Sequence, residues 1–127
     1  MSRVVFDASA LLTAAHNEPG TDLVFRHAQD SVVSTVNLAE AQAKLVRRGL
    51  PPEDAWQVAL TFCHQIVPFD ADQARLTGEI VPMTSPLGLS LGDRACLALA
   101  MLLKLPVYTG DRMWKKLQLE VEIRLLR

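Results

Sequence analysis

The chain has 127 residues, of which half are apolar and 21% are charged, with 13 Lys plus Arg against 14 Asp plus Glu. This length suits one domain with one buried core, so we expect a single domain over residues 1–127. The formal net charge of −1 favours no class of partner, although a local basic patch or a bridging cation can still bind phosphate.

Neither a secretory signal nor a membrane span is expected. Only three residues precede the first apolar run, which leaves no room for the apolar core of a signal peptide. The longest apolar run, residues 95–103, is shorter than the ~20 residues that a transmembrane helix needs. We therefore expect a cytoplasmic protein without membrane contact.

Segments typical of strands and of helices alternate along the chain. Strands are expected at residues 4–6, 31–34, 66–69, 106–111 and 120–125. Helices are expected at residues 8–15, 22–28, 35–48, 52–63, 70–81, 90–103 and 111–117, with a loop at 82–89. Pro68 cannot donate to a strand ladder, which places the third strand at a sheet edge. This alternation predicts an α/β fold, a three-layer α/β/α sandwich around a mainly parallel sheet of about five strands.

Carboxylates follow two of the predicted strands. Asp7 ends the run Val4-Val5-Phe6, and Asp111 follows the strand that begins near Pro106. Because the carboxyl ends of parallel strands share one edge of a sheet, we expect both side chains at the edge where such folds bind ligands.

Two further acids map toward this edge. Asp93 lies in the first turn of the helix over 90–103, and Glu40 lies in the second turn of the helix over 35–48. Each acid also has a purely local interpretation. Asp7 would cap a helix, Ser90-x-x-Asp93 fits a capping box, and Glu40 is spaced to pair with Lys44.

Four converging carboxylates repel one another unless protons or cations neutralise them. Oxygen ligands of this kind suit Mg²⁺ or Mn²⁺, and the sequence has no Cys/His cluster that would indicate zinc or iron. The residues therefore predict a magnesium or manganese site that leaves positions open for a substrate phosphate and for an attacking water.

The chain resembles PIN-domain ribonucleases, and most closely the VapC-type toxins of type II toxin–antitoxin pairs. Four segments carry the resemblance, in the order Val5–Leu11, Ser34–Ala41, Leu91–Ala95 and Thr109–Arg112.

The resemblance implies a PIN-like fold, a metal-binding quartet, an RNA substrate and an antitoxin partner. The quartet and catalytic acids would be Asp7, Glu40, Asp93 and Asp111, with Ser9 and Thr109 as hydroxyls that order the acids or a metal-bound water. The implied reaction is hydrolysis of an RNA phosphodiester bond by metal-activated water, which leaves a 5′-phosphate and a 3′-hydroxyl. Some family members carry another acid just after the position of Asp111, whereas residues 112–119 contain none here. A VapB-like antitoxin is expected from the resemblance alone.

Basic side chains near the rim of such a site are candidates for contacts with flanking phosphates. The main candidates are Arg94, Arg112, Lys115 and Lys116, with Lys44, Arg47 and Arg48 further along the chain. A separate expectation is a homodimer, since Ala55, Val58, Ala59 and Phe62 offer more apolar surface than a monomer core needs.

Two other functions stay open at the level of sequence. One is phosphotransfer through an aspartyl-phosphate on Asp7, although Ser9 stands where haloacid-dehalogenase phosphatases need a second acid. The other is a non-catalytic subunit that binds a partner and whose acids only stabilise the starts of helices.

Overall fold

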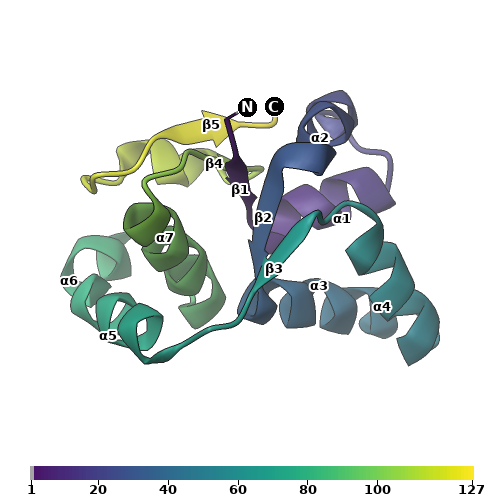
Figure 1. Cartoon of the computed structure of the whole chain (residues 1–127), viewed down its shortest axis with the longest axis horizontal. Helices are drawn as coiled ribbons and strands as arrows, with labels where there is room; N and C mark the ends of the chain where they lie inside the picture. The colour runs from purple at the N-terminus through teal and green to yellow at the C-terminus, as the bar shows by residue number, and fades with distance from the viewer. Residues whose placement is uncertain (1) are drawn as a thin grey trace.

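A five-stranded sheet forms the centre of the molecule in the computed structural model, which describes residues 2–127 (Figure 1). The strands are β1 (Val4–Phe6), β2 (Ser31–Ser34), β3 (Gln65–Val67), β4 (Val107–Thr109) and β5 (Ile123–Leu125). Their order is β3-β2-β1-β4-β5, and every neighbouring pair is parallel. The predicted parallel sheet is confirmed, with β3 at an edge as Pro68 indicated.

The strand order reverses between β1 and β4. From β1 the chain adds β2 and β3 on one side, and later adds β4 and β5 on the other. In open α/β sheets such a switch point leaves a crevice at the carboxyl ends of the two central strands. Asp7 directly follows β1, and Asp111 lies two residues beyond β4.

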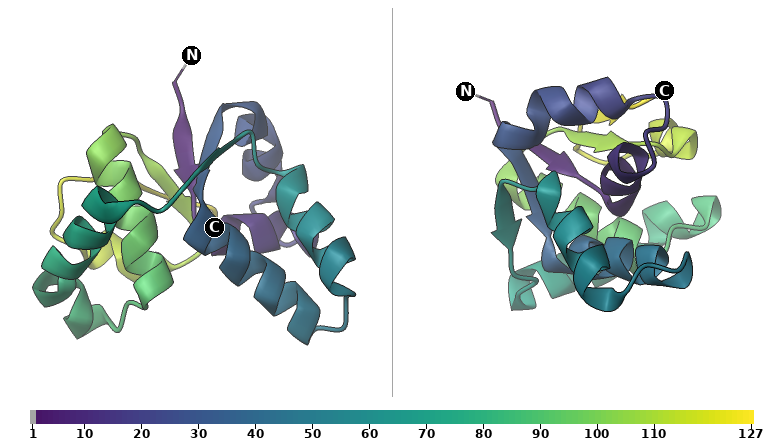
Figure 2. Two further views of the ribbon diagram at one scale, coloured as in Figure 1. Left: turned by 60° about the horizontal axis from the view of Figure 1, so that its bottom comes forward. Right: turned by 90° about the vertical axis from the view of Figure 1, so that its right-hand side faces the viewer.

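Helices cover both faces of the sheet, which gives the predicted three layers. The α-helices are α1 (Ala8–Ala15), α2 (Thr21–His27), α3 (Thr35–Arg47), α4 (Pro52–Thr61), α5 (Ala71–Glu79), α6 (Val81–Thr84) and α7 (Leu91–Leu103). Helices α1 to α4 gather on one side of the sheet, and α5 to α7 on the other (Figures 1 and 2). Three 3₁₀ turns complete the described chain, η1 (Ala28–Asp30), η2 (Ser85–Leu87) and η3 (Arg112–Lys116).

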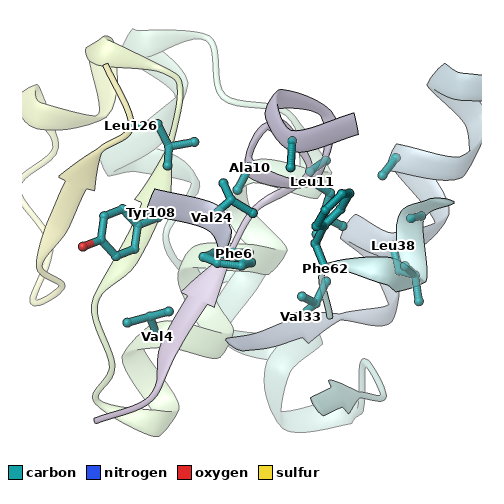
Figure 3. Close-up of a cluster of buried hydrophobic side chains, with 14 residues drawn as sticks. Val4, Phe6, Ala10, Leu11, Val24, Val33, Leu38, Phe62, Tyr108 and Leu126 are labelled. Carbon is teal, nitrogen blue, oxygen red and sulfur yellow. The ribbon is translucent and has the colours of Figure 1, made fainter. Parts of the chain in front are cut away.

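The alternation of side chains along the strands divides the core in two. Phe6 faces α1 and α2, where it packs among Leu11, Val24 and Tyr108 (Figure 3). Its neighbour Val5 faces the opposite side and belongs to the cluster around α7. Because both faces of β1 are buried, its residues are apolar without interruption, as central parallel strands require.

Some predicted boundaries differ from the structure. The predicted loop over 82–89 instead contains α6 and η2, because Pro82 sits in the first turn of α6, where no intrahelical donor is lost. The predicted helix over 111–117 is the 3₁₀ turn η3, and the last strand is shorter than predicted.

The apolar residues on which the homodimer expectation rested belong mostly to the core of the chain itself. Ala55, Ala59 and Phe62 are buried, and Ala59 and Phe62 pack in the cluster that contains α1 and α2. They are not available as an interface, so the homodimer remains a prediction without this support. Among the described residues, no helix combines the length and the apolar character that crossing a membrane requires.

Candidate active site

The four acids predicted from the sequence line one cavity of about 340 Å³ at the switch point of the sheet. Asp7 comes from the end of β1, Glu40 from α3, Asp93 from the first turn of α7, and Asp111 from the segment after β4. Ser9, Lys44 and Ser90 also contribute to its wall. Acids that are distant in sequence therefore meet at one place, as the parallel sheet predicted.

Asp7 is the buried and fixed member of this group, with only 4% of its surface exposed. The hydroxyl of Ser9 and the backbone N–H of Ala10 donate to Oδ1 at 2.6 and 2.9 Å. The hydroxyl of Thr109 donates to Oδ2 at 2.6 Å. In turn, Ser9 Oγ accepts from the N–H of Gly110 at 2.8 Å, so β4 and α1 hold the carboxylate between them.

Despite these hydrogen bonds, burial makes the charged form of Asp7 unfavourable. Burial raises the pKa of Asp7 from 3.8 to about 6, against the lowering effect of hydrogen bonds from Ser9, Thr109 and Ala10. The nearby charge of Asp93 raises this pKa further. A cation in the cavity would oppose both the loss of solvation and the repulsion between the carboxylates.

Each acid also has a local partner, which for Asp7, Asp93 and Glu40 is the one predicted from the sequence. Asp7 caps α1, and Asp93 forms a capping box with Ser90, whose backbone N–H donates to Asp93 Oδ2 at 2.9 Å. Asp111 Oδ1 accepts from the N–H of Met113 at 2.9 Å. These capping contacts do not exclude a functional role, because they hold the carboxylates at the rim of a shared cavity.

Glu40 reaches the cavity over a glycine in α7. A Cβ atom at Gly92 would lie 2.8 Å from Glu40 Oε1, so the approach of Glu40 requires the absence of a side chain there. Lys44 Nζ lies 3.7 Å from Glu40 Oε2 and partly neutralises it.

Asn37 is a supporting residue that the sequence interpretation missed. Its Nδ2 donates to the carbonyl of Gly92 at 2.9 Å and so ties α3 to the start of α7. Its Oδ1 is buried and has no hydrogen-bond partner among the described residues. The available signal was an amide four residues before Ala41 and eight before Leu45, on the apolar face of α3.

The donor set fits a divalent cation such as Mg²⁺ or Mn²⁺, since all four acids supply hard, anionic oxygen. As they stand, however, no three His, Cys, Asp or Glu side chains among residues 2–127 are gathered closely enough to hold an ion. The physical reason is that Glu40, Asp93 and Asp111 are each turned toward a local partner. A site that used all four carboxylates would therefore require the ends of these three side chains to turn toward Asp7.

The main basic candidates from the sequence, Arg94, Arg112, Lys115 and Lys116, do not line this cavity. Arg94 Nη1 donates to the carbonyl of Thr77 at 3.0 Å and so connects α7 to α5. Arg112 Nη1 donates to the carbonyl of Arg127 at 3.2 Å, and Lys115 and Lys116 are exposed on η3. Lys44 is the cation that does reach the acids.

Comparison with solved structures shows a shared fold at low sequence identity. VapBC from Salmonella typhimurium, solved bound to DNA, is 19% identical over the full length of both chains, with a TM-score of 0.75. VapC20 from Mycobacterium tuberculosis, described as a sarcin-ricin loop cleaving toxin, is 19% identical over 94% of this chain and 98% of that one, with a TM-score of 0.72. VapBC2 from Rickettsia felis, bound to a DNA fragment from its promoter, is 15% identical over 96% and 97%, with a TM-score of 0.74.

No curated protein sequence matches the chain. The sequence profile of the PIN domain, in contrast, matches residues 4–119, a span that contains all four acids and every element from β1 to η3. On this match the chain belongs to the PIN domain family.

Proposed function

We propose that the protein is a Mg²⁺- or Mn²⁺-dependent endoribonuclease and the toxin of a toxin–antitoxin pair. The observation that carries the proposal is the convergence of Asp7, Glu40, Asp93 and Asp111 on one cavity. These acids come from four separate segments, and their local capping contacts do not account for this meeting. Membership of the PIN domain family supports the same reaction class.

We assign the four acids two different roles in metal binding, according to how many hydrogen bonds hold each carboxylate. Asp7 would anchor the cation, because three donors fix its carboxylate and Thr109 and Ser9 set its orientation. Glu40, Asp93 and Asp111 would complete the coordination from the rim. A bound divalent ion supplies the neutralisation of charge and the activation of water that phosphodiester hydrolysis needs.

The proposed reaction forms a bond from water oxygen to phosphorus and breaks the bond from phosphorus to O3′. The leaving O3′ takes up a proton, which yields a 3′-hydroxyl and leaves the phosphate on the 5′ side of the following nucleotide. RNA carries negative charge to a cavity of four acids, so both binding and cleavage should depend on the metal.

The proposed partner is a VapB-like antitoxin. The structural neighbours include toxin–antitoxin complexes, among them VapBC from Salmonella typhimurium and a complex from Klebsiella pneumoniae. A homodimer and a cytoplasmic location complete the proposal.

A thermal titration with Mg²⁺ and with Mn²⁺ tests the metal site before any RNA target is known. An ion that binds only the folded state stabilises it by about 1.4 to 2.7 kcal/mol at 10 to 100 times its Kd. We expect this stabilisation in the wild type and its loss in Asp93→Asn. Asn still offers an oxygen to the N–H of Ser90, so the capping contact is kept.

Asp72→Asn is the matched control, because Asp72 lies in the first turn of α5 and outside the cavity. Cleavage of a mixed pool of RNA by the wild type and by Asp72→Asn, but not by Asp93→Asn, would support the nuclease. Equal metal stabilisation in all three proteins would contradict it and favour the partner-binding subunit.

Phosphotransfer through Asp7 fits the structure less well. Its carboxylate is buried and both oxygens accept hydrogen bonds, whereas a nucleophile must reach the phosphorus of its substrate. Incorporation of a hydroxylamine-labile phosphate on Asp7 would favour phosphotransfer over the nuclease.

A further inference from the structure

A second cavity, of about 370 Å³, adjoins the one lined by the acids, and its walls are basic. Lys44, Arg47 and Arg48 come from the end of α3, and Arg127 comes from the far end of the chain. The two cavities share Ser9 and Lys44 in their walls, so they are contiguous. We call the second one the basic cavity.

Most of the positive charge in the basic cavity is not neutralised by the protein. Arg47, Arg48 and Arg127 have no carboxylate within 4.0 Å among residues 2–127, and Glu18 is the one acid in the wall. Basic residues in the last turn of a helix commonly complement its dipole, which is a sufficient explanation for Arg47 and Arg48. It does not explain Arg127, which joins them from outside the helix.

Arg127 is held in position by contacts with two residues that do not line the cavity. Its Nη1 donates to Thr13 Oγ1 at 2.9 Å and to the carbonyl of Pro19 at 3.0 Å. These bonds fix the guanidinium before any ligand binds, so less side-chain freedom is lost when an anion arrives.

We propose that the basic cavity binds a backbone phosphate of the RNA strand next to the phosphate held at the acids. The proposal rests on the nuclease function proposed above and assigns the strand a path across the end of α3. One guanidinium group can donate two parallel hydrogen bonds to two oxygens of a phosphate. Such contacts position a strand without reading its bases. The path therefore follows Lys44, Arg47 and Arg48, which the sequence had named only as further candidates, and adds Arg127. It does not follow the main candidates Arg94, Arg112, Lys115 and Lys116.

The position of the basic cavity beside the acids would also offset their repulsion of an RNA strand. Four acids repel a polyanion, and the bound cation offsets this only at the scissile phosphate. A strand that crosses the site brings its next phosphate within one nucleotide of the acids, where the contiguous cavity supplies unpaired cations. Lys44 stands between the two cavities, and a metal ion that recruits Glu40 would release it toward the strand.

The test compares Arg47→Gln/Arg48→Gln with a control that loses the same charge elsewhere. Arg26→Gln/Arg75→Gln removes two exposed arginines on α2 and α5 that line neither cavity. A fluorescent single-stranded RNA of mixed sequence is titrated with each full-length protein, and the anisotropy gives the Kd. EDTA keeps the RNA intact, and the titration is repeated over a series of salt concentrations.

The logarithm of the RNA association constant falls with the logarithm of the salt concentration, and each phosphate contact on a single strand adds about 0.7 to the steepness of this fall. Loss of one contact should therefore make the slope shallower by about 0.7 and weaken RNA binding about fivefold at 0.1 M salt. We expect this change in Arg47→Gln/Arg48→Gln and not in the control, with equal melting temperatures. The single variants Arg47→Gln and Arg48→Gln should each show part of the loss. Equal Kd values and slopes in the double variant and the control would overturn the proposal.

Cleavage of the same RNA with Mg²⁺ separates this proposal from the proposed function. Loss of RNA affinity in Arg47→Gln/Arg48→Gln, with no cleavage by the wild type, would support the RNA site and reject the nuclease. Cleavage by both proteins with the same KM would support the nuclease and reject the RNA site. Unchanged RNA binding together with lost binding of a purified antitoxin would assign the basic cavity to a protein partner and overturn the proposal.

Discussion

Replacing Asp7 by Asn should stabilise the metal-free protein at neutral pH. The pKa of Asp7 is raised from 3.8 to about 6, mainly by burial, so the folded state binds its proton more tightly than the unfolded state does. Between these two values stability falls as the pH rises, and above about pH 6 the cost of the buried charge is fully present.

The size of the effect follows from the two pKa values. A difference of about two pH units corresponds to about 3 kcal/mol. This is an upper value, because Asn has one acceptor oxygen and its amide nitrogen cannot accept the hydrogen bond that Thr109 donates to Oδ2. We expect a gain of about 1 to 3 kcal/mol at pH 7.5 for Asp7→Asn. A carboxylate that served only as a helix cap would instead cost about 1 kcal/mol when replaced by a residue unable to cap.

Urea unfolding followed by circular dichroism, in EDTA at intervals from pH 4 to 8, measures this difference. Subtracting the curve of Asp7→Asn from that of the wild type isolates the titration of Asp7 from that of other groups. The wild type should lose stability relative to the variant between about pH 4 and 6, and saturating Mg²⁺ should reverse the order at pH 7.5. A variant that is less stable than the wild type at pH 7.5 in EDTA would refute the reasoning.

Three further substitutions test the surroundings of the acids through thermal titration with Mg²⁺. Gly92→Ala should raise the half-saturating concentration by about tenfold or more, because its methyl group displaces Glu40, while stability in EDTA changes by less than about 1 kcal/mol. A titration like that of the wild type would count against a role for Glu40. Thr109→Val removes a hydrogen bond that lowers the pKa of Asp7, so a proton should compete better with the metal. The affinity for Mg²⁺ should therefore weaken more at pH 6 than at pH 8, and equal weakening at both pH values would contradict this. Lys44→Met removes the cation that competes for Glu40 and should lower the half-saturating concentration by about two- to fivefold, whereas an increase would show that Lys44 supports metal binding.

The sequence alone predicted the fold class and the four acids that the structure brings to one cavity. Strand-forming runs that end in Asp7 and Asp111 are local patterns, and a parallel sheet leaves one place where the ends of such strands can meet. Helix starts at Ser90 and at Ala8 are equally local, because a side chain and the next few backbone N–H groups decide them.

Tertiary packing decided the finer features of the site. The approach of Glu40 over Gly92 and the bond from Asn37 to the same glycine depend on how α3 crosses the start of α7. The raised pKa of Asp7 depends on the layers that exclude water from β1 and β4.

The sequence named Lys44, Arg47 and Arg48 of the basic cavity only as further candidates, and it did not indicate Arg127. Arg94 directly follows an acid of the site in sequence, yet its guanidinium binds a carbonyl of α5. Arg127 is not adjacent in sequence to any of the four acids of the cavity, yet it lines the neighbouring basic cavity. Adjacency along the chain fixes only where the backbone of a residue lies, whereas the direction of a long side chain depends on donors and acceptors that other elements bring to it.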